Sequence, residues 1–167
     1  MKILTLGLLL PLIAFAQKIQ IESDDATNFS KFKSFAIRDG QLNSKNPALN
    51  SELVRKRLDE DIRKALEAKG LLFVGSGQAD LNVRYTLGAA RKVERERYPS
   101  GWRGMGTRVV KVPYTEGTLV IDLRDQSTRS LVWRAIAREE KSDASKIEGK
   151  LNDMVRKSFD KYPPKSK

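Results

Sequence analysis

The chain has 167 residues, a net charge of +11 at neutral pH, and neither histidine nor cysteine. These absences exclude disulfides, catalysis by a thiolate or a Ser-His-Asp triad, and metal sites ligated by histidine or cysteine. We therefore expect no cofactor, no metal and no catalytic constellation. The basic excess favours polyanions or acidic membrane surfaces as partners, the alternative being a charge that serves solubility only.

The first 16 residues have the pattern of a secretory signal peptide. Lys2 supplies a positive charge, residues 3–13 form an apolar run, and residues 14–16 read Ala-Phe-Ala, a typical cleavage site. The run is shorter than the about 20 residues of a membrane-spanning helix, so an uncleaved anchor is the less favoured alternative. We expect residues 1–16 to be removed, which gives a periplasmic or secreted protein for which nucleic acid is an unfavoured partner.

The mature chain is then residues 17–167, and no composition break divides it into two domains. Gln17 stands where a lipoprotein would carry a cysteine, so we do not expect a Cys-anchored lipoprotein. No later apolar run is long enough for a transmembrane segment. We therefore expect a single domain that is stabilised by its hydrophobic core alone.

The N-terminal part of the mature chain predicts two strands. Residues 18–22 alternate polar and apolar side chains, and residues 34–37 have the character of a second strand. Three phenylalanines, Phe29, Phe32 and Phe35, are expected in the core. Asp39-Gly40 predicts a turn, which leads into a polar loop that extends to Pro47.

Residues 51–69 predict an amphipathic helix, because their apolar side chains recur at i, i+3 and i+4. Asn50 or Ser51 can cap its N-terminus, and Gly70 stands where a helix commonly ends. The opposite face is rich in charges with i, i+4 partners, which indicates a solvated surface.

A β-hairpin over residues 117–137 is the clearest strand signal, and shorter strand patterns occur at residues 71–74, 81–87 and 109–112. The larger apolar residues of both hairpin strands have odd residue numbers. For them to lie on one face, odd-numbered residues must pair with odd-numbered residues, so the two residue numbers of each pair sum to an even number. The side chains expected at the centre of the core are Trp133, Leu119, Ile121 and Tyr85.

Residues 142–161 predict the last helix, with Ser145 and Glu148 spaced as a capping box and Gly149 as a weak point. Two amphipathic helices and about six strands, joined mostly by short connections, predict an α+β domain. We expect one antiparallel β-sheet of about six strands with two α-helices packed on one face.

Several short motifs follow one another in a defined order. They are F-S-K-F-K-S-F-A-I at 29–37, A-D-L-N-V-R-Y at 79–85, G-T-L-V-I-D-L at 117–123, L-V-W-R-A at 131–135 and F-D-K-Y-P-P at 159–164. Together they resemble the bacterial domain of unknown function 4136 family over essentially the whole mature chain. The resemblance implies an envelope-located α+β domain, often a lipoprotein, with no established activity and no catalytic residues.

Carboxylates, Ser, Lys and Tyr remain as candidates for catalysis. The adjacent pairs Asp24-Asp25 and Glu139-Glu140 would place their side chains on opposite faces of a strand, so neither predicts an acid–base dyad. We therefore expect a non-enzymatic protein that binds an envelope component. The alternative is a small hydrolase that acts on an envelope polymer through carboxylates.

The first candidate binding site is a basic segment from Arg91 to Lys111, of which we expect residues 91–108 to be a flexible loop. We interpret it as a site for an anionic envelope polymer or lipid surface, the alternative being a twisted hairpin extension whose charges are merely solvated. The residues proposed to bind are Arg91, Lys92, Arg95, Arg97, Tyr98, Trp102, Arg103 and Arg108.

The second candidate is the exposed face of the predicted sheet. Its arginines could contact an envelope protein or an anionic ligand. The alternative is a wet face on which Asp122 and Arg134 screen each other. The arginines in question are Arg84, Arg124, Arg134 and Arg138.

Overall fold

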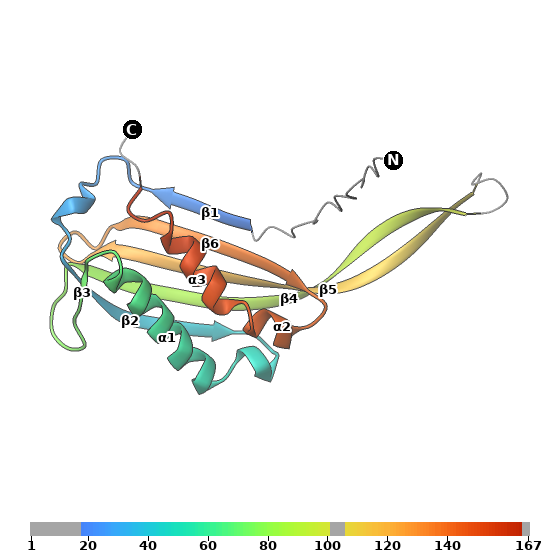
Figure 1. The fold of residues 1–167 in the computed structure, drawn as a ribbon, viewed down its shortest axis with the longest axis horizontal. Helices are drawn as coiled ribbons and strands as arrows, with labels where there is room; N and C mark the ends of the chain where they lie inside the picture. Colours follow the sequence, from blue (N-terminus) through green and yellow to red (C-terminus); the bar gives the residue numbers. More distant parts are fainter. Residues whose placement is uncertain (1–17, 101–105, 165–167) are drawn as a thin grey trace, which may run out of the picture.

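The structure is a computed structural model that describes residues 18–100 and 106–164 (Figure 1). The predicted signal peptide lies outside these residues. No helix in the described segments is long and apolar enough to cross a membrane. The elements follow the chain in the order β1 (Lys18–Ser23), η1 (Phe29–Lys31), β2 (Ser34–Asn43), η2 (Pro47–Leu49), α1 (Glu52–Glu67), β3 (Leu72–Phe73), β4 (Leu81–Ser100), β5 (Gly106–Asp125), β6 (Leu131–Lys141), α2 (Ala144–Glu148) and α3 (Leu151–Phe159).

The strands form one mixed six-stranded sheet in the order β1-β6-β5-β4-β2-β3. Neighbours from β1 to β4 are antiparallel, whereas β2 runs parallel to both β3 and β4. The α+β class is confirmed, but the expectation of a purely antiparallel sheet is wrong. The physical reason is α1, which carries the chain back along the sheet between β2 and β3, as parallel strands require.

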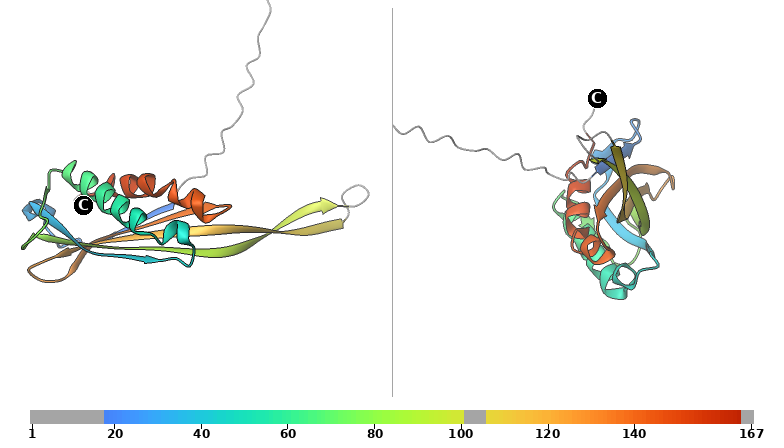
Figure 2. Two further views of the ribbon diagram at one scale, coloured as in Figure 1. Left: turned by 90° about the horizontal axis from the view of Figure 1, so that it is seen from below. Right: turned by 90° about the vertical axis from the view of Figure 1, so that its right-hand side faces the viewer.

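The three α-helices lie on one side of the sheet and leave its other side uncovered (Figure 2). Helix α1 begins as the sequence predicts, because the Ser51 hydroxyl accepts a hydrogen bond from the Val54 backbone N–H at 3.2 Å. After the helix ends, Gly70 has φ = 85°, a conformation that glycine adopts without strain.

The last predicted helix is divided into α2 and α3, which makes three α-helices rather than two. Asp143, not Ser145, caps α2, since its carboxylate accepts the backbone N–H of Lys146 at 3.1 Å. The division falls at Gly149 and Lys150, where glycine weakens the helical conformation.

Strand β2 is longer than the sequence predicts, because Asp39 and Gly40 lie inside it rather than in a turn. The register against β4 shifts between Ile37 and Asp39, which is a β-bulge. A Cβ atom on Gly40 would overlap the ring of Tyr85. The glycine is therefore required by close packing of a side chain on the strand.

The core lies between the helices and the covered face of the sheet. Trp133 is fully buried and stacks on Phe159 of α3, with ring centroids 5.3 Å apart. Leu119 and Ile121 are also fully buried, and the buried Tyr85 donates its hydroxyl to a carboxylate oxygen of α1 at 2.7 Å. The alternation of the hairpin strands thus packs one face against the helices.

Strands β4 and β5 extend beyond the rest of the sheet as a twisted two-stranded ribbon (Figure 1). Strand β6 ends at Lys141, opposite Thr115, and beyond this point β4 and β5 pair only with each other. We call the described ribbon, residues 91–100 and 106–115, the arm. The expectation of a flexible loop at 91–108 is wrong for its described part, which keeps an unbroken strand register and has the geometry of the alternative, a twisted hairpin extension.

Candidate functional site

The pleat of the arm separates its basic residues onto two faces. In a strand, alternate side chains point to opposite sides, so Arg91, Arg95 and Arg97 share a face with Lys111, which is paired directly with Arg95. This face continues the helix-covered side of the sheet, because Arg91 follows the partly buried Ala89 at a spacing of two. We call these four cations the basic face.

No described side chain on the basic face carries a carboxylate. Arg95 and Lys111 are both exposed, and neither has an ion-pair partner among the residues that the structure describes. Directly opposed residues on an antiparallel pair have Cβ atoms only about 4.5–5.5 Å apart, so two like charges there destabilise the pair. The basic face therefore holds positive charge that the described chain does not neutralise.

The opposite face of the arm is electrically mixed. Lys92 lies there and forms an ion pair with Glu116, with Nζ and Oε1 2.7 Å apart. Glu94 and Arg108 share this face by the same alternation. The sequence prediction placed Lys92 and Arg108 in one set with the arginines of the basic face, but the pleat divides them.

Two further members of the predicted set are only partly placed. Tyr98 occupies a strand position opposite Arg108, and nothing more is described of it. Trp102 and Arg103 lie outside the described residues.

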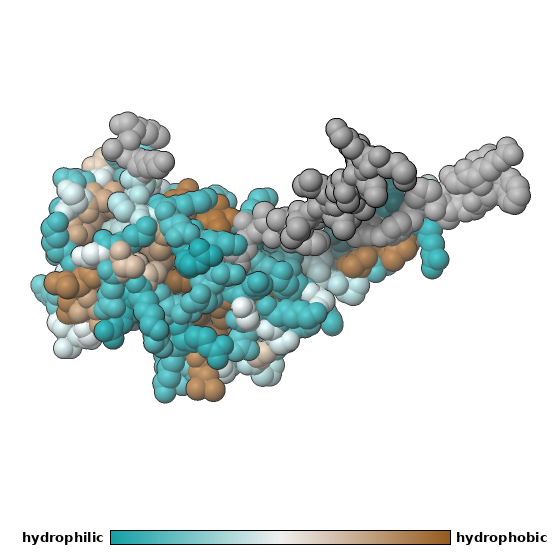
Figure 3. Space-filling model, in the orientation of Figure 1, coloured by the Kyte–Doolittle hydropathy of each residue, from teal (hydrophilic) through white to brown (hydrophobic). Residues whose placement is uncertain are grey.

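The arm also exposes apolar side chains. Val93 and Val109 on the face of the basic residues are 57% and 52% exposed, and Figure 3 shows apolar surface on the arm. Exposed valines beside unpaired cations suit a ligand that presents both charge and apolar groups.

A pocket of about 560 Å³ with a mixed polar and apolar lining lies where the arm leaves the body of the molecule. Arg91 and Thr115 line it from the arm, and Asn43 lines it from the end of β2. Lys45, just after β2, and Asp143, just before α2, also line it. Parallel pairing brings the end of β2 beside β4, and β6 ends at the same end of the sheet. The segment after β2, the start of the arm and the segment after β6 therefore meet here. We call this cavity the root pocket.

The uncovered face of the sheet carries charges of alternating sign. Asp39, Arg84, Asp122, Arg134 and Glu22 follow one another across five neighbouring strands. Arg134 donates from Nε and from one terminal nitrogen to the two oxygens of Asp122, both at 2.7 Å. The bidentate pair raises the pKa of Arg134, which stays charged and remains bound to Asp122.

The other two arginines predicted on this face have different surroundings. Arg124 lies at a register shift, opposite Leu131, and donates to the backbone carbonyl oxygen of Arg129 at 3.2 Å. Arg138 lies opposite Lys18 of β1, at the edge of the sheet. The four arginines therefore do not form one cationic patch. The even-sum register of the hairpin, with Ile121 opposite Ala135, is as the sequence predicts.

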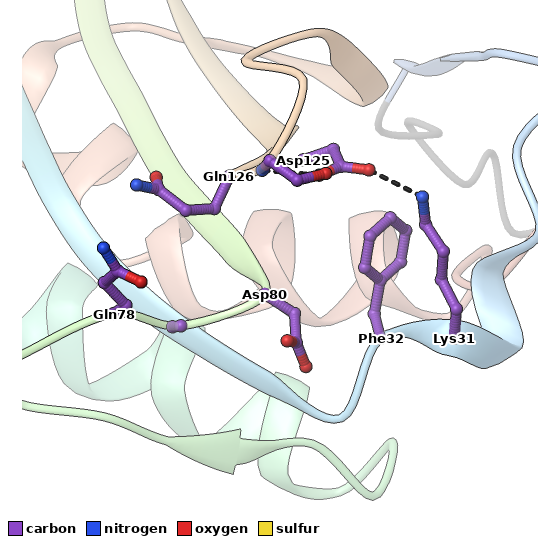
Figure 4. Close-up of a pocket in the computed structure, with 8 residues that line it drawn as sticks. Lys31, Phe32, Gln78, Asp80, Asp125 and Gln126 are labelled. Carbon is purple, nitrogen blue, oxygen red and sulfur yellow. Dashed lines mark hydrogen bonds and ion pairs between the residues drawn. The ribbon is translucent and has the colours of Figure 1, made fainter.

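A second pocket, of about 450 Å³, lies at the end of the sheet away from the arm (Figure 4). Lys31 reaches across it to Asp125, with Nζ and Oδ2 2.7 Å apart. Asp125 also accepts hydrogen bonds from Ser127, and the Lys31 ammonium and this hydroxyl hold its pKa well below the usual range. Asp80 accepts two backbone N–H groups, which lowers its pKa as well.

Both carboxylates of the second pocket are thus ionised and occupied by hydrogen bonds that fix turns. Neither can act as a general acid near neutral pH, since that role requires a proton to donate. Within residues 18–100 and 106–164, no cluster of three or more His, Cys, Asp or Glu side chains could hold a metal ion.

Sequence reasoning included Lys111 in the basic segment but missed that it pairs with Arg95, and it missed Lys45 and Thr115 in the root pocket. The pairing could have been found by extending the hairpin register through Pro113, which is tolerated because β5 is an edge strand there. Lys45 carries no local signal, because only the parallel placement of β2 brings it beside the arm.

The fold and site define an α+β domain with a projecting basic arm. The chain belongs to the family Domain of unknown function (DUF4136), whose model matches residues 19–164, and this confirms the resemblance. No curated protein matches the chain.

Two solved structures show the same fold at low sequence identity. A PelC dodecamer from Paraburkholderia phytofirmans is 13% identical, with a TM-score of 0.51 over 86% of this chain and 95% of that one. A PDZ domain protein from Parabacteroides distasonis is 15% identical, with a TM-score of 0.57 over 89% of this chain. The matched region spans only 35% of that second protein.

Proposed function

We propose that the protein is a non-enzymatic component of the bacterial envelope that binds an anionic envelope component through the basic face of its arm. The observation that carries this proposal is the directly opposed pair Arg95 and Lys111, exposed and without a carboxylate on their face. A bound anion would offset the repulsion between the two cations. The signal-peptide pattern of residues 1–16 supports the envelope location.

The described carboxylates favour binding over hydrolysis. Asp80 and Asp125 line one pocket. Both oxygens of Asp125 accept hydrogen bonds, from Lys31 and Ser127, and the Oδ2 atom of Asp80 accepts two backbone N–H groups. Asp122 is held by Arg134 in the same way. Because these carboxylates are ionised or paired, they do not supply the protonated acid that a hydrolase acting through two carboxylates needs.

The test is the affinity of the mature chain for two anionic probes, polygalacturonate and phosphatidylglycerol vesicles. The variant Arg95→Gln/Lys111→Gln removes two charges from the basic face. With about 1 kcal/mol for each cation, binding to the recognised probe should weaken on the order of 30-fold at low salt. It should also be lost at about 0.5 M salt, where exposed charges are screened.

The matched control is Lys92→Gln/Arg108→Gln, which removes the same charge from the other face of the same arm. Its affinity should stay within about threefold of wild type, since these side chains point away from the ligand. Equal weakening by both variants would mean that only net charge matters and would overturn the assignment to one face. Binding to neither probe, or binding that survives high salt, would also contradict the proposal.

A further inference from the structure

The root pocket lies at the inner end of the basic face, so the two can be occupied by one ligand. Arg91 belongs to both, because it lines the pocket and begins the row of cations along the arm. At about 3.3 Å per residue, Arg95 lies about 13 Å further out along the strand. A ligand that touches both is therefore an extended chain that carries several negative charges.

The lining of the root pocket shows which further groups this ligand would present. Asn43, Lys45, Arg91 and Thr115 all line it, and none has a side-chain hydrogen bond or ion pair with another residue of the described chain. An amide and a hydroxyl can each donate and accept, which suits the hydroxyl groups of a sugar. The two cations suit a carboxylate or another anionic substituent.

The one carboxylate of the pocket is already engaged. The Oδ1 atom of Asp143 accepts the Lys146 backbone N–H at 3.1 Å and the Ser145 hydroxyl at 2.5 Å, which holds the start of α2. The remaining wall includes Pro47, Ala89 and Ala144, whose apolar surfaces suit the C–H groups of a sugar ring. The volume of about 560 Å³ lies within the usual range of about 300–1,000 Å³ for ligand pockets.

We infer that the root pocket is a subsite for a sugar residue of an acidic polysaccharide whose chain continues along the basic face of the arm. This inference rests on the proposed function and narrows its ligand from any anion to a hydroxyl-bearing one. A planar lipid surface contacts the outward cations of the arm but does not enter a pocket walled by the end of β2 and by α2.

The experiment uses a variant that changes no charge. Asn43→Ala/Thr115→Val removes the free amide and hydroxyl from the pocket while every cation stays in place. The matched control is Thr107→Val, which removes a hydroxyl from the same face of the arm outside the pocket. Thermal melting of each variant verifies folding, and calorimetry measures binding to trigalacturonate and to tripolyphosphate, an anion without sugar hydroxyls.

We expect the pocket variant to bind trigalacturonate about five- to tenfold more weakly, as expected for one or two lost hydrogen bonds. Its affinity for tripolyphosphate should be unchanged, and the Thr107→Val control should bind both probes like wild type. Unchanged trigalacturonate binding by the folded pocket variant would overturn the subsite. So would wild-type binding to phosphatidylglycerol vesicles but to no saccharide.

These outcomes are separable from failure of the proposed function. Suppose that Arg95→Gln/Lys111→Gln weakens polygalacturonate binding but the pocket variant does not weaken trigalacturonate binding. The proposed function of the basic face is then supported, and the inferred subsite is refuted. If Arg95→Gln/Lys111→Gln weakens binding to neither polygalacturonate nor vesicles, the proposed function itself falls.

Discussion

The body of the molecule and its arm are built from the same two strands, β4 and β5, but their side chains meet different constraints. In the body, the odd-numbered positions carry buried apolar residues such as Val83, Tyr85 and Ile121, which the helices cover. In the arm, the same series of positions carries exposed cations and valines. One strand pair thus contributes to the core along one part of its length and carries the proposed binding surface along the other.

The comparison also holds for charge. On the uncovered face of the body, Arg134 is paired with Asp122 in a bidentate contact. On the basic face of the arm, Arg95 faces Lys111. A protein gains nothing in folding energy from the second arrangement, and this is why it points to a ligand.

The largest expected effect comes from the body. Trp133→Ala removes a fully buried ring that stacks on Phe159 and should lower the free energy of unfolding by about 3–5 kcal/mol. Chemical denaturation measures this change. An unfolding free energy equal to that of wild type would refute the central position of Trp133. The exposed Leu53→Ala serves as control and should change stability by less than about 0.5 kcal/mol.

An intermediate, pH-dependent effect is expected at the end of the body away from the arm. The folded state lowers the pKa of Asp125, so this group stabilises the fold above the pKa of the unfolded chain, about 3.9, and loses that contribution as the pH falls. Asp125→Asn should therefore lower the free energy of unfolding by about 1–3 kcal/mol at about pH 7.

The difference between Asp125→Asn and wild type should shrink as the pH falls below about 4, which denaturation at a series of pH values measures. The exposed carboxylate of Asp160 provides the control, since Asp160→Asn should leave stability nearly unchanged. A difference that is constant over the whole pH range would contradict the role assigned to the Lys31 contact.

The smallest expected effect sharpens the contrast between stability and binding within the arm. Arg95→Glu converts the repulsive pair with Lys111 into an attractive one, worth about 0.2–1 kcal/mol. Amide hydrogen exchange in the arm should slow by up to about fivefold. The exchange rates of the Arg95→Gln variant should lie between those of the Arg95→Glu variant and wild type. The Arg95→Glu variant should also bind the anionic probes more weakly than Arg95→Gln or wild type. If its arm amides exchange faster than those of wild type, Arg95 and Lys111 do not repel each other in the folded arm.

Much of the body follows from local sequence patterns. The stripe of apolar residues in α1, the Ser51 cap and Gly70 predict that helix to within a few residues. The alternation in the hairpin fixes which face is buried, so the even-sum register could be predicted from the alternation alone. The family resemblance could likewise be stated from ordered motifs.

The sequence supports the arm only as an alternative to a flexible loop, and the reason is physical. A two-stranded ribbon that is wet on both faces has no hydrophobic alternation, and Pro113 indicated a break in the strand. Strand register is weakly signalled where neither face is buried. The register that pairs Arg95 with Lys111 is established only by the pairing of β4 with β5.

The sequence by itself determined the basic charge, the missing histidine and cysteine, and the periodicities that place Trp133 and Ile121 in the core. Each of these depends on composition or on neighbours close in the chain. The tertiary structure alone decided that β2 runs parallel, that Arg95 pairs with Lys111, and that Lys45 and Arg91 line the same pocket. These features depend on which distant segments pair and in which register, and short-range patterns carry little information about either.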